Sequence, residues 1–380
     1  MANKERKASK AKMDTRPRYK PPGRLGDTKM ELFQDPRANS KLIEAMAEFG
    51  IERNRAPPSL ATLSPDSTVE ELSMSMAEAE SAFEQLYDAL PNDLPQDALE
   101  LEVIEEEELI DGPSNTKLQL HIFRPRLRGG PLPGVIYLHS GHMTMLKTMN
   151  KVHRRWCISL AGQGMVAIAV DFRNAWSEAG MNPFPAGLDD CCAAVQWVHA
   201  NKDRLNIRNM ILQGEGGGAN LALAAALKGN REGWSYKLDG VYASSPEISG
   251  AYSWSEDRKL LELPSLIECH GYFVNVDFQA YVAHVYTPRS ADLTNPLAWP
   301  YHATKRDMDG LPPHVLAMNE LDPLRDEGMA YYRKLSAAGV KCTAHVNLGH
   351  THSASLIFRQ ALPEDHRAAI KSIAAFAKSV

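Results

Sequence analysis

The stretch "ILQGEGGGANLALAAAL", residues 211–227, decides how the fold of this chain is interpreted. It has the pattern of a short apolar strand, a glycine-dense turn and an alanine-rich helix. One turn with this outline binds dinucleotides, and Gly214, Gly216 and Ala219 match its G-x-G-x-x-A pattern. Another is the nucleophile elbow, G-x-S-x-G, which presents a serine above a sheet. Gly214 and Gly218 match the elbow, but Gly216 stands where its serine belongs.

The position of the turn in the chain favours the elbow. A dinucleotide-binding turn follows the first strand of its unit, with an acidic residue about 20 positions further on at the end of the second strand. Here the turn follows the fourth or fifth expected strand, and Asp239 begins its strand instead of ending it. We therefore interpret residues 211–227 as an elbow that lacks a nucleophile.

Strand-like stretches alternate with amphipathic helical ones from about residue 100 to the end of the chain. Strands are predicted at 99–109, 117–123, 134–140, 166–172, 210–213, 238–244, 314–319 and 342–347, and those at 134–140 and 166–172 are apolar runs rich in β-branched residues. Helices are expected between most of them, which predicts a mostly parallel sheet covered on both faces. The predicted fold class is α/β: a mostly parallel eight-stranded sheet flanked by helices, with an antiparallel strand among the first two and a helical cap.

The predicted organisation has three parts. Residues 1–30 form a disordered basic arm, because they are rich in lysine and arginine and lack an apolar core. Residues 31–95 form an N-terminal helical cap segment. Residues 96–380 form the α/β domain, and within them residues 250–306 are too long and too rich in aromatic residues and proline for a plain loop. We expect 31–95 and 250–306 together to form the cap over the open edge of the sheet.

Composition excludes several classes of function. A net charge of −5 argues against nucleic acid as the main partner. No apolar run reaches the roughly 18 residues of a membrane span. The chain has 5 cysteines without metal-ligand spacing, and an odd number without a disulfide pattern favours a reducing, cytoplasmic location. We expect no metal and no other cofactor. A small-molecule substrate is expected, and the sequence is compatible with a homodimer.

Other motifs stand where an elbow needs its partners. "YLHSGHMTM", residues 137–145, follows the third expected strand, where backbone N–H donors for an oxyanion are expected. "NELDPLRDEG", residues 319–328, supplies an acid just past a buried strand. "VNLGHTHSA", residues 346–354, supplies two histidines just past the next strand. The order along the chain is elbow, acid, histidine, as in α/β-hydrolases.

Taken together, these motifs resemble the hormone-sensitive-lipase-like branch of the α/β-hydrolases, a group of carboxylesterases. The resemblance covers roughly residues 100–378. It is carried, in order, by "YLHSGH", "VAIAVDFRNA", "PFPAGLDDCCAAVQWV", "GEGGGANLALA", "NELDPLRDEG" and "GHTHSA". It implies that Asp322 is the catalytic acid, that His352 is the catalytic histidine, and that Gly216 occupies the position of the nucleophilic serine.

The resemblance also implies an oxyanion hole, and here the chain departs from the family. Two of three family glycines are replaced, by Ser140 and His142, while Gly141 remains. We assign the oxyanion hole to Gly141, His142 and Gly217, and the His142 side chain either enters the pocket or packs under the cap. Substrate binding is assigned to three further residues, His139, Glu215 and His350.

Three functions remain open at this point. The first is a nucleophile-free enzyme that acts on a small to medium ester or carbonyl substrate, with the Asp322–His352 dyad as general base. The second is an ordinary carboxylesterase whose serine was replaced by design at 216. The third is a small-molecule receptor. The retained acid and histidine argue against a receptor. The family's histidine element ends in glycine, and Ser353 stands there in this chain. The simultaneous changes at 140, 142, 216 and 353 argue against a single designed replacement.

Overall fold

The computed structural model describes residues 20–54, 56–64, 66–94, 102–126 and 129–380. The prediction of a disordered arm over 1–30 therefore lies mostly outside the described residues. Residues 20–30 differ from it, because they include the short helix α1 (Gly23–Gly26). Its Gly23 is buried so closely against the backbone of Glu268 that a Cβ would lie 2.7 Å from the carbonyl oxygen.

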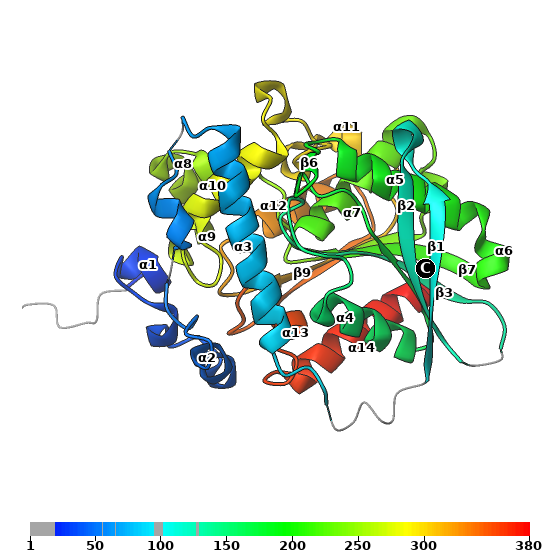
Figure 1. Cartoon of the computed structure of the whole chain (residues 1–380), viewed down its shortest axis with the longest axis horizontal. Coiled ribbons are helices and arrows are strands. Elements are labelled where there is room, and N and C mark those ends of the chain that lie inside the picture. The colour runs from blue at the N-terminus through cyan, green and yellow to red at the C-terminus, as the bar shows by residue number, and fades with distance from the viewer. Residues whose placement is uncertain (1–19, 55, 65, 95–101, 127–128) are drawn as a thin grey trace, which may run out of the picture.

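An eight-stranded sheet runs through the molecule in the order β1-β2-β4-β3-β7-β8-β9-β10 (Figure 1). Strand β2 is antiparallel to both of its neighbours, and the remaining neighbouring pairs are parallel. The strands are β1 (Val103–Asp111), β2 (Lys117–Pro125), β3 (Leu132–Leu138), β4 (Val166–Val170), β7 (Ile207–Glu215), β8 (Gly240–Ser244), β9 (His314–Asn319) and β10 (Cys342–Asn347). The predicted fold class is confirmed. A small hairpin of β5 (Trp176–Ser177) and β6 (Gly180–Met181) was not predicted.

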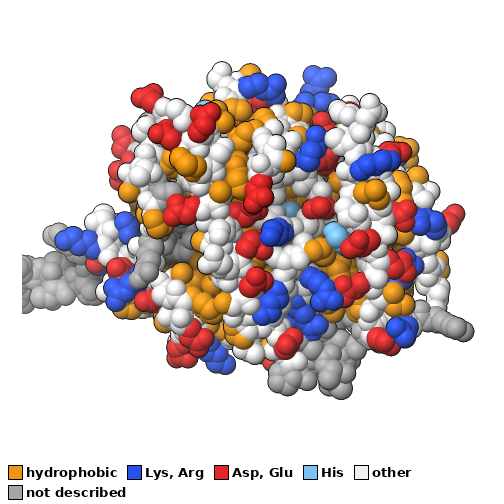
Figure 2. Space-filling model, in the orientation of Figure 1, with side chains coloured by type: hydrophobic (Ala, Val, Ile, Leu, Met, Phe, Trp, Pro, Cys, Tyr) orange, Lys and Arg blue, Asp and Glu red, His pale blue; other side chains and the backbone are white. Residues whose placement is uncertain are grey.

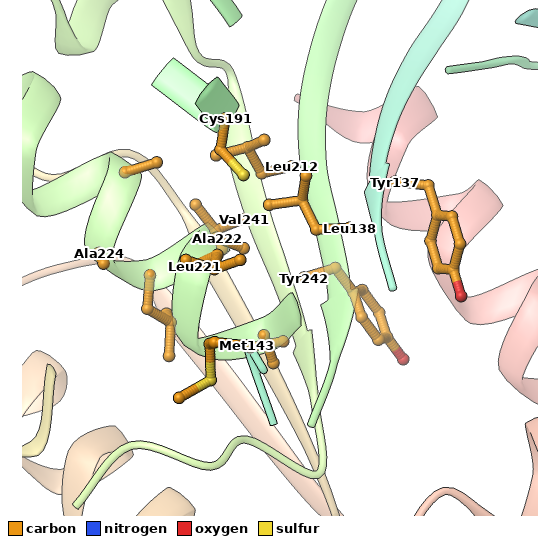
Figure 3. Close-up of a cluster of buried hydrophobic side chains, with 14 of the residues drawn as sticks. Tyr137, Leu138, Met143, Cys191, Leu212, Leu221, Ala222, Ala224, Val241 and Tyr242 are labelled. Carbon is orange, nitrogen blue, oxygen red and sulfur yellow. The ribbon is translucent and has the colours of Figure 1, made fainter. Parts of the chain in front are cut away.

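Helices cover both faces of the sheet (Figure 1). On one face lie α4 (Lys151–Gly162) and α14 (Pro363–Ser379), and on the other lie α5 (Ala186–Ala200), α7 (Gly217–Glu232) and α12 (Arg325–Ala337). Because both faces are covered, every residue of the central strand β4 is apolar and buried. Figure 3 shows Leu138, Leu212 and Val241 of three neighbouring strands beside Leu221 and Ala222 of α7.

The two segments that were predicted to form a cap are helical. The first contains α2 (Ser40–Ala47) and α3 (Val69–Ala89), and the second contains α8 (Glu256–Glu262), α9 (Ser265–Glu268) and α10 (Val276–Tyr286). Phe83 of α3 meets Phe273 edge to face, with ring centroids 6.2 Å apart, so the two segments touch. The boundaries of the cap remain a prediction. The remaining short helices are α6 (Lys202–Leu205), α11 (Lys305–Met308) and α13 (Ala354–Ile357).

A cluster of ion pairs joins the N-terminal segment to the rest of the molecule. The Arg37 guanidinium lies 2.7 Å from the Asp35 carboxylate and 2.5 Å from that of Glu268 in α9. Arg325, the first residue of α12, lies 2.8 Å from the other oxygen of Glu268. The two carboxylates are buried. The N-terminal segment is thus connected, through Glu268, to the helix that follows the proposed catalytic acid.

The surface carries charges of both signs. On the face in Figure 2, lysine, arginine, aspartate and glutamate side chains are interspersed with hydrophobic ones. No helix among the described residues is both long enough and apolar enough to cross a membrane.

Candidate active site

The elbow is a sharp turn at Gly216, between the end of β7 and the start of α7. Gly216 has φ 54° and ψ −119°, a conformation that favours glycine because a side chain is strained there. Its N–H donates to the Ser244 carbonyl at 3.0 Å. A Cβ placed on Gly216 would lie 3.0 Å from Nε2 of His352 and 3.3 Å from the Cβ of Ser140. A side chain at position 216 would therefore point toward the His352 imidazole.

The other glycines of the turn are explained by packing. A Cβ on Gly218 would lie 1.9 Å from the Leu138 carbonyl oxygen, and one on Gly214 would lie 2.3 Å from the carbonyl carbon of Gly218. No side chain fits at either position, because α7 begins directly against β3 and β7. This close packing accounts for the glycine-dense sequence without a pyrophosphate, and it agrees with the elbow interpretation.

The structure brings His352 and Asp322 together. His352 follows β10, Asp322 follows β9, and the imidazole Nδ1 lies 2.9 Å from Oδ2 of Asp322. The Leu324 N–H donates to the other carboxylate oxygen at 2.9 Å and so holds Asp322 in place. A proton on Nδ1 that is donated to Asp322 leaves Nε2 free to act as a base toward Gly216.

The electrostatic surroundings of His352 favour its charged form. Burial of the ring alone would lower the pKa of His352, because it removes the imidazolium from water. The charge and the hydrogen bond of Asp322, together with the charges of Glu247 and Glu215, outweigh burial and raise the pKa above its usual value. Nε2 of His352 is therefore a stronger base than that of a free histidine.

The loop after β3 presents backbone N–H groups beside the elbow. Gly141 has φ 109°, and a Cβ there would lie 2.0 Å from the Met145 carbonyl oxygen, so the loop requires glycine at this position. Among the described residues, no acceptor faces the N–H groups of Gly141 and His142. Gly217 is the first residue of α7, and its N–H has no partner within the helix. The Ser140 N–H differs, since it donates to Glu215 at 3.2 Å.

His142, on the same loop, carries a second imidazole that is bound to a carboxylate from another part of the chain. His142 Nδ1 lies 2.7 Å from Oε2 of Glu247, a fully buried residue after β8. The Gln279 side chain in α10 contacts both groups: its Nε2 donates to Oε1 of Glu247 and lies 2.8 Å from Nδ1 of His142. The His142 side chain thus contacts Gln279 of α10, in one of the two segments that were predicted to form the cap.

Several of these groups line a cavity of about 650 Å³, namely Ser140, Gly141, His142, Gly217 and His352. The lining also includes five further polar residues, Arg53, Glu78, Gln85, Asn275 and Gln279. The rest of the walls is mainly apolar and comes chiefly from the two segments predicted to form the cap, with Phe49, Ile51, Ala79, Ala82, Phe83, Leu86, Tyr87, Phe273, Val274 and Phe278. A mainly apolar site of this size suits a small or medium-sized, largely apolar molecule.

The three residues assigned to substrate binding do not line this cavity. His139 is stacked between His153 and Phe172 in the core, where burial lowers its pKa to about 4. Glu215 is buried, and it accepts a hydrogen bond from the Tyr137 hydroxyl at 2.5 Å. Burial also raises the pKa of Glu215 to about 7.

His350 likewise lies outside the main cavity. It lines a separate cavity of about 340 Å³ that Glu215 also borders, and its Nε2 is 3.7 Å from a carboxylate oxygen of Asp365. Among the described residues, no group of three or more histidine, cysteine, aspartate or glutamate side chains is arranged to hold a metal ion.

Glu247 and Gln279 were missed by sequence analysis. Glu247 offered a usable signal, since it is an acidic residue two positions after the apolar "VYASS" run, at the end of a sheet where ligand sites gather. Gln279 offered none, because it lies inside an irregular segment and reaches the site through the packing of α10.

Comparison with known proteins agrees with the fold. A family model described as the alpha/beta hydrolase fold matches residues 135–356. The structure is similar to that of brefeldin A esterase, a bacterial homologue of human hormone-sensitive lipase, with a TM-score of 0.92 and 44% sequence identity. That similarity covers 94% of this chain and 98% of the esterase.

Curated relatives are more distant. The putative alpha/beta hydrolase R526 of Acanthamoeba polyphaga mimivirus is 29% identical over 240 residues, which are 62% of this chain and 65% of the viral protein. Carboxylesterase NlhH of Mycobacterium tuberculosis is 28% identical over 233 residues, 59% of this chain and 67% of the enzyme. The chain thus spans about two thirds of the length of these relatives.

Proposed function

This chain belongs to the α/β-hydrolase family, and from that premise we propose that it hydrolyses a small to medium-sized, largely apolar ester without a covalent acyl-enzyme. In this proposal the Asp322–His352 dyad is the general base, and backbone N–H groups of Gly141 and Gly217 stabilise the oxyanion. The same base acting on a substrate proton gives the related cleavage or cyclisation of a carbonyl compound.

One observation carries the proposal. A Cβ on Gly216 would lie 3.0 Å from Nε2 of His352, so the base faces a residue that has no side-chain oxygen or sulfur. A water molecule there would lie within reach of Nε2 and beside the N–H groups of the loop. An acyl-enzyme needs a nucleophilic side chain at this point, and glycine has none.

Other side chains do not readily take over as nucleophile. None of the five cysteines, all of which lie within the described residues, lines the cavity. The lining hydroxyl groups belong to Ser140 and Tyr87, and burial raises the pKa of Tyr87, which makes its phenolate harder to form. The Cβ of Ser140 lies beside the elbow, 3.3 Å from the position of a Cβ on Gly216, but among the described residues no hydrogen bond joins the Ser140 hydroxyl to His352.

The proposed hydrolysis has two stages, attack of water on the ester and departure of the alcohol. His352 takes a proton from water as the water oxygen bonds to the ester carbonyl carbon, and the carbonyl oxygen becomes an oxyanion that accepts hydrogen bonds from Gly141 and Gly217. The carbon–oxygen bond to the leaving group then breaks, and the leaving oxygen takes its electron pair and a proton. The products are a carboxylic acid and an alcohol, and His352 returns to its neutral form.

Mass spectrometry tests the proposal directly. Turnover of a p-nitrophenyl ester in H₂¹⁸O should place one label in the acid product, and rapid quenching should find the protein at its unmodified mass. A protein carrying an acyl group, on Ser140 or elsewhere, would overturn the proposal. Unlabelled, rearranged product from a carbonyl substrate would indicate lyase or cyclase chemistry instead. A compound bound tightly and recovered unchanged would indicate a receptor.

The pH dependence follows from the surroundings of His352. The base works when neutral, and its pKa is raised above the usual value of 6.5, mainly by Asp322. The kcat/KM for p-nitrophenyl butyrate should therefore rise with pH along one limb whose midpoint lies above 6.5, and activity should be lost as pH falls through that pKa. A profile measured from pH 5 to 9 checks this, and a midpoint well below 6.5 would exclude His352 as the base.

A further inference from the structure

We propose that His142 is the general acid of this reaction, and that Glu247 and Gln279 position it opposite the base His352. The inference rests on the proposed function, since it names the group that protonates the leaving alcohol. It gives the site two carboxylate-bound imidazoles, one on each side of the elbow.

The hydrogen bonds define which nitrogen of His142 is free. Both contacts of the ring are made by Nδ1, which lies 2.7 Å from Oε2 of Glu247 and 2.8 Å from Nε2 of Gln279. The Gln279 amide also donates to the other oxygen of Glu247 and closes the cluster. Nε2 is therefore the atom of His142 that remains available, and His142 lines the cavity.

The cluster is also fixed to the elbow itself. The backbone N–H of Glu247 donates to the Gly216 carbonyl at 3.3 Å, and the Glu247 carbonyl accepts from the Asn220 amide in α7 at 2.8 Å. A Cβ on Gly217 would lie 2.9 Å from the carbonyl carbon of His142. The second dyad therefore lies against the same turn that faces His352.

The backbone of His142 does not set it apart, because its φ of 61° lies in the left-handed region together with those of Met143 at 59° and Leu146 at 77° on the same loop. What sets His142 apart is the fully buried carboxylate of Glu247 that is bound to its imidazole. A buried carboxylate that orients an imidazole beside a cavity is an arrangement that suits proton transfer.

The chemistry assigns complementary tasks to the two imidazoles. As the tetrahedral intermediate collapses, the carbon–oxygen bond breaks, its electron pair moves to the leaving oxygen, and protonated His142 gives that oxygen the proton on Nε2. Meanwhile His352 holds the proton taken from water, and exchange with solvent restores both imidazoles. An alkoxide leaving group needs this proton, whereas p-nitrophenolate, a weak base, leaves without it.

Leaving-group dependence is the decisive test. His142→Asn suits the backbone because asparagine tolerates the left-handed region. We expect it to lower kcat/KM for ethyl butyrate about 10²- to 10³-fold, the usual contribution of a general acid, and for p-nitrophenyl butyrate less than about 5-fold. Glu247→Gln should show the same selective loss to a smaller extent. His284→Asn, which removes an exposed imidazole from the same helix as Gln279, is the matched control and should change neither rate.

The outcomes separate this inference from the proposed function. Equal losses on both esters would show that His142 only shapes the oxyanion loop, and no loss on either would show that it is idle; both results overturn the inference. If His142→Asn fails to fold, His142→Gly relieves the strain and carries the same expectation. If His352→Ala leaves both rates unchanged, the proposed function itself fails, and the assignment of His142 fails with it.

Discussion

Replacing His352 with alanine, or Asp322 with asparagine, is expected to lower kcat/KM for ester hydrolysis by about 10³- to 10⁴-fold. The first change removes the base. The second leaves the ring but replaces the oxygen that accepts its Nδ1 proton at 2.9 Å, so the imidazole loses its orientation and its tautomer. Steady-state kinetics of the two variants with p-nitrophenyl butyrate measure both effects.

His350→Ala is the control for the dyad, because its imidazole lies nearby in sequence but borders a different cavity. It should retain most of the activity. Binding of a substrate analogue should change little in either dyad variant, since neither side chain forms the apolar walls. If all three variants kept full activity, the site described above would not be where the chemistry occurs.

Gly216→Ser is expected to weaken the native reaction about 100-fold and to lower the free energy of unfolding by about 1–3 kcal/mol. The added Cβ would lie 3.0 Å from His352 Nε2, closer than side chains ordinarily allow, so the ring must move by a few tenths of an ångström. The new hydroxyl would also occupy the place of the attacking water. Kinetics and denaturant unfolding of the same preparation measure the two effects.

The control here is Gly216→Ala, which has the same backbone strain without a hydroxyl. We expect similar losses of stability in the two variants and no burst of p-nitrophenol from either. A burst in Gly216→Ser equal to the enzyme concentration, with a butyryl group found on the introduced hydroxyl by mass spectrometry, would show a carboxylesterase that lacks only its serine. That result would contradict the proposed mechanism.

Much of the fold follows from the sequence because its signals are local. The predicted ranges overlap all eight strands of the main sheet. The buried strands β3, β4 and β9 are apolar runs, whereas β1 was recognised from a run that is rich in glutamate. The elbow was recognisable because close packing of α7 demands glycines at fixed spacing. Their place after consecutive strands indicated Asp322 and the two histidines His350 and His352, and the family resemblance selected His352. The structure places Asp322 and His352 in contact.

The residues that were misplaced show the limit of such reasoning. His139 precedes Ser140, and Glu215 precedes Gly216, so each is a chain neighbour of a residue at the site. His139 lies just past the end of β3, and Glu215 is the last residue of β7. Both side chains are buried in the core and do not belong to the lining of the cavity. Sequence position alone did not specify on which side each would lie.

The ion-pair cluster at Arg37 has a consequence for local opening of the molecule. The N–H of Asn39, two residues after Arg37, donates to the Gly349 carbonyl at 3.0 Å. The N–H of Leu321 donates to the His350 carbonyl at 2.9 Å. Ion pairs and backbone hydrogen bonds therefore join three segments: residues 35–39, the loop of the proposed catalytic histidine and the loop of its acid. Such a set opens as a cooperative unit, so hydrogen exchange in these three segments should proceed at a common rate, and entry of substrate must rely on movements elsewhere around the cavity.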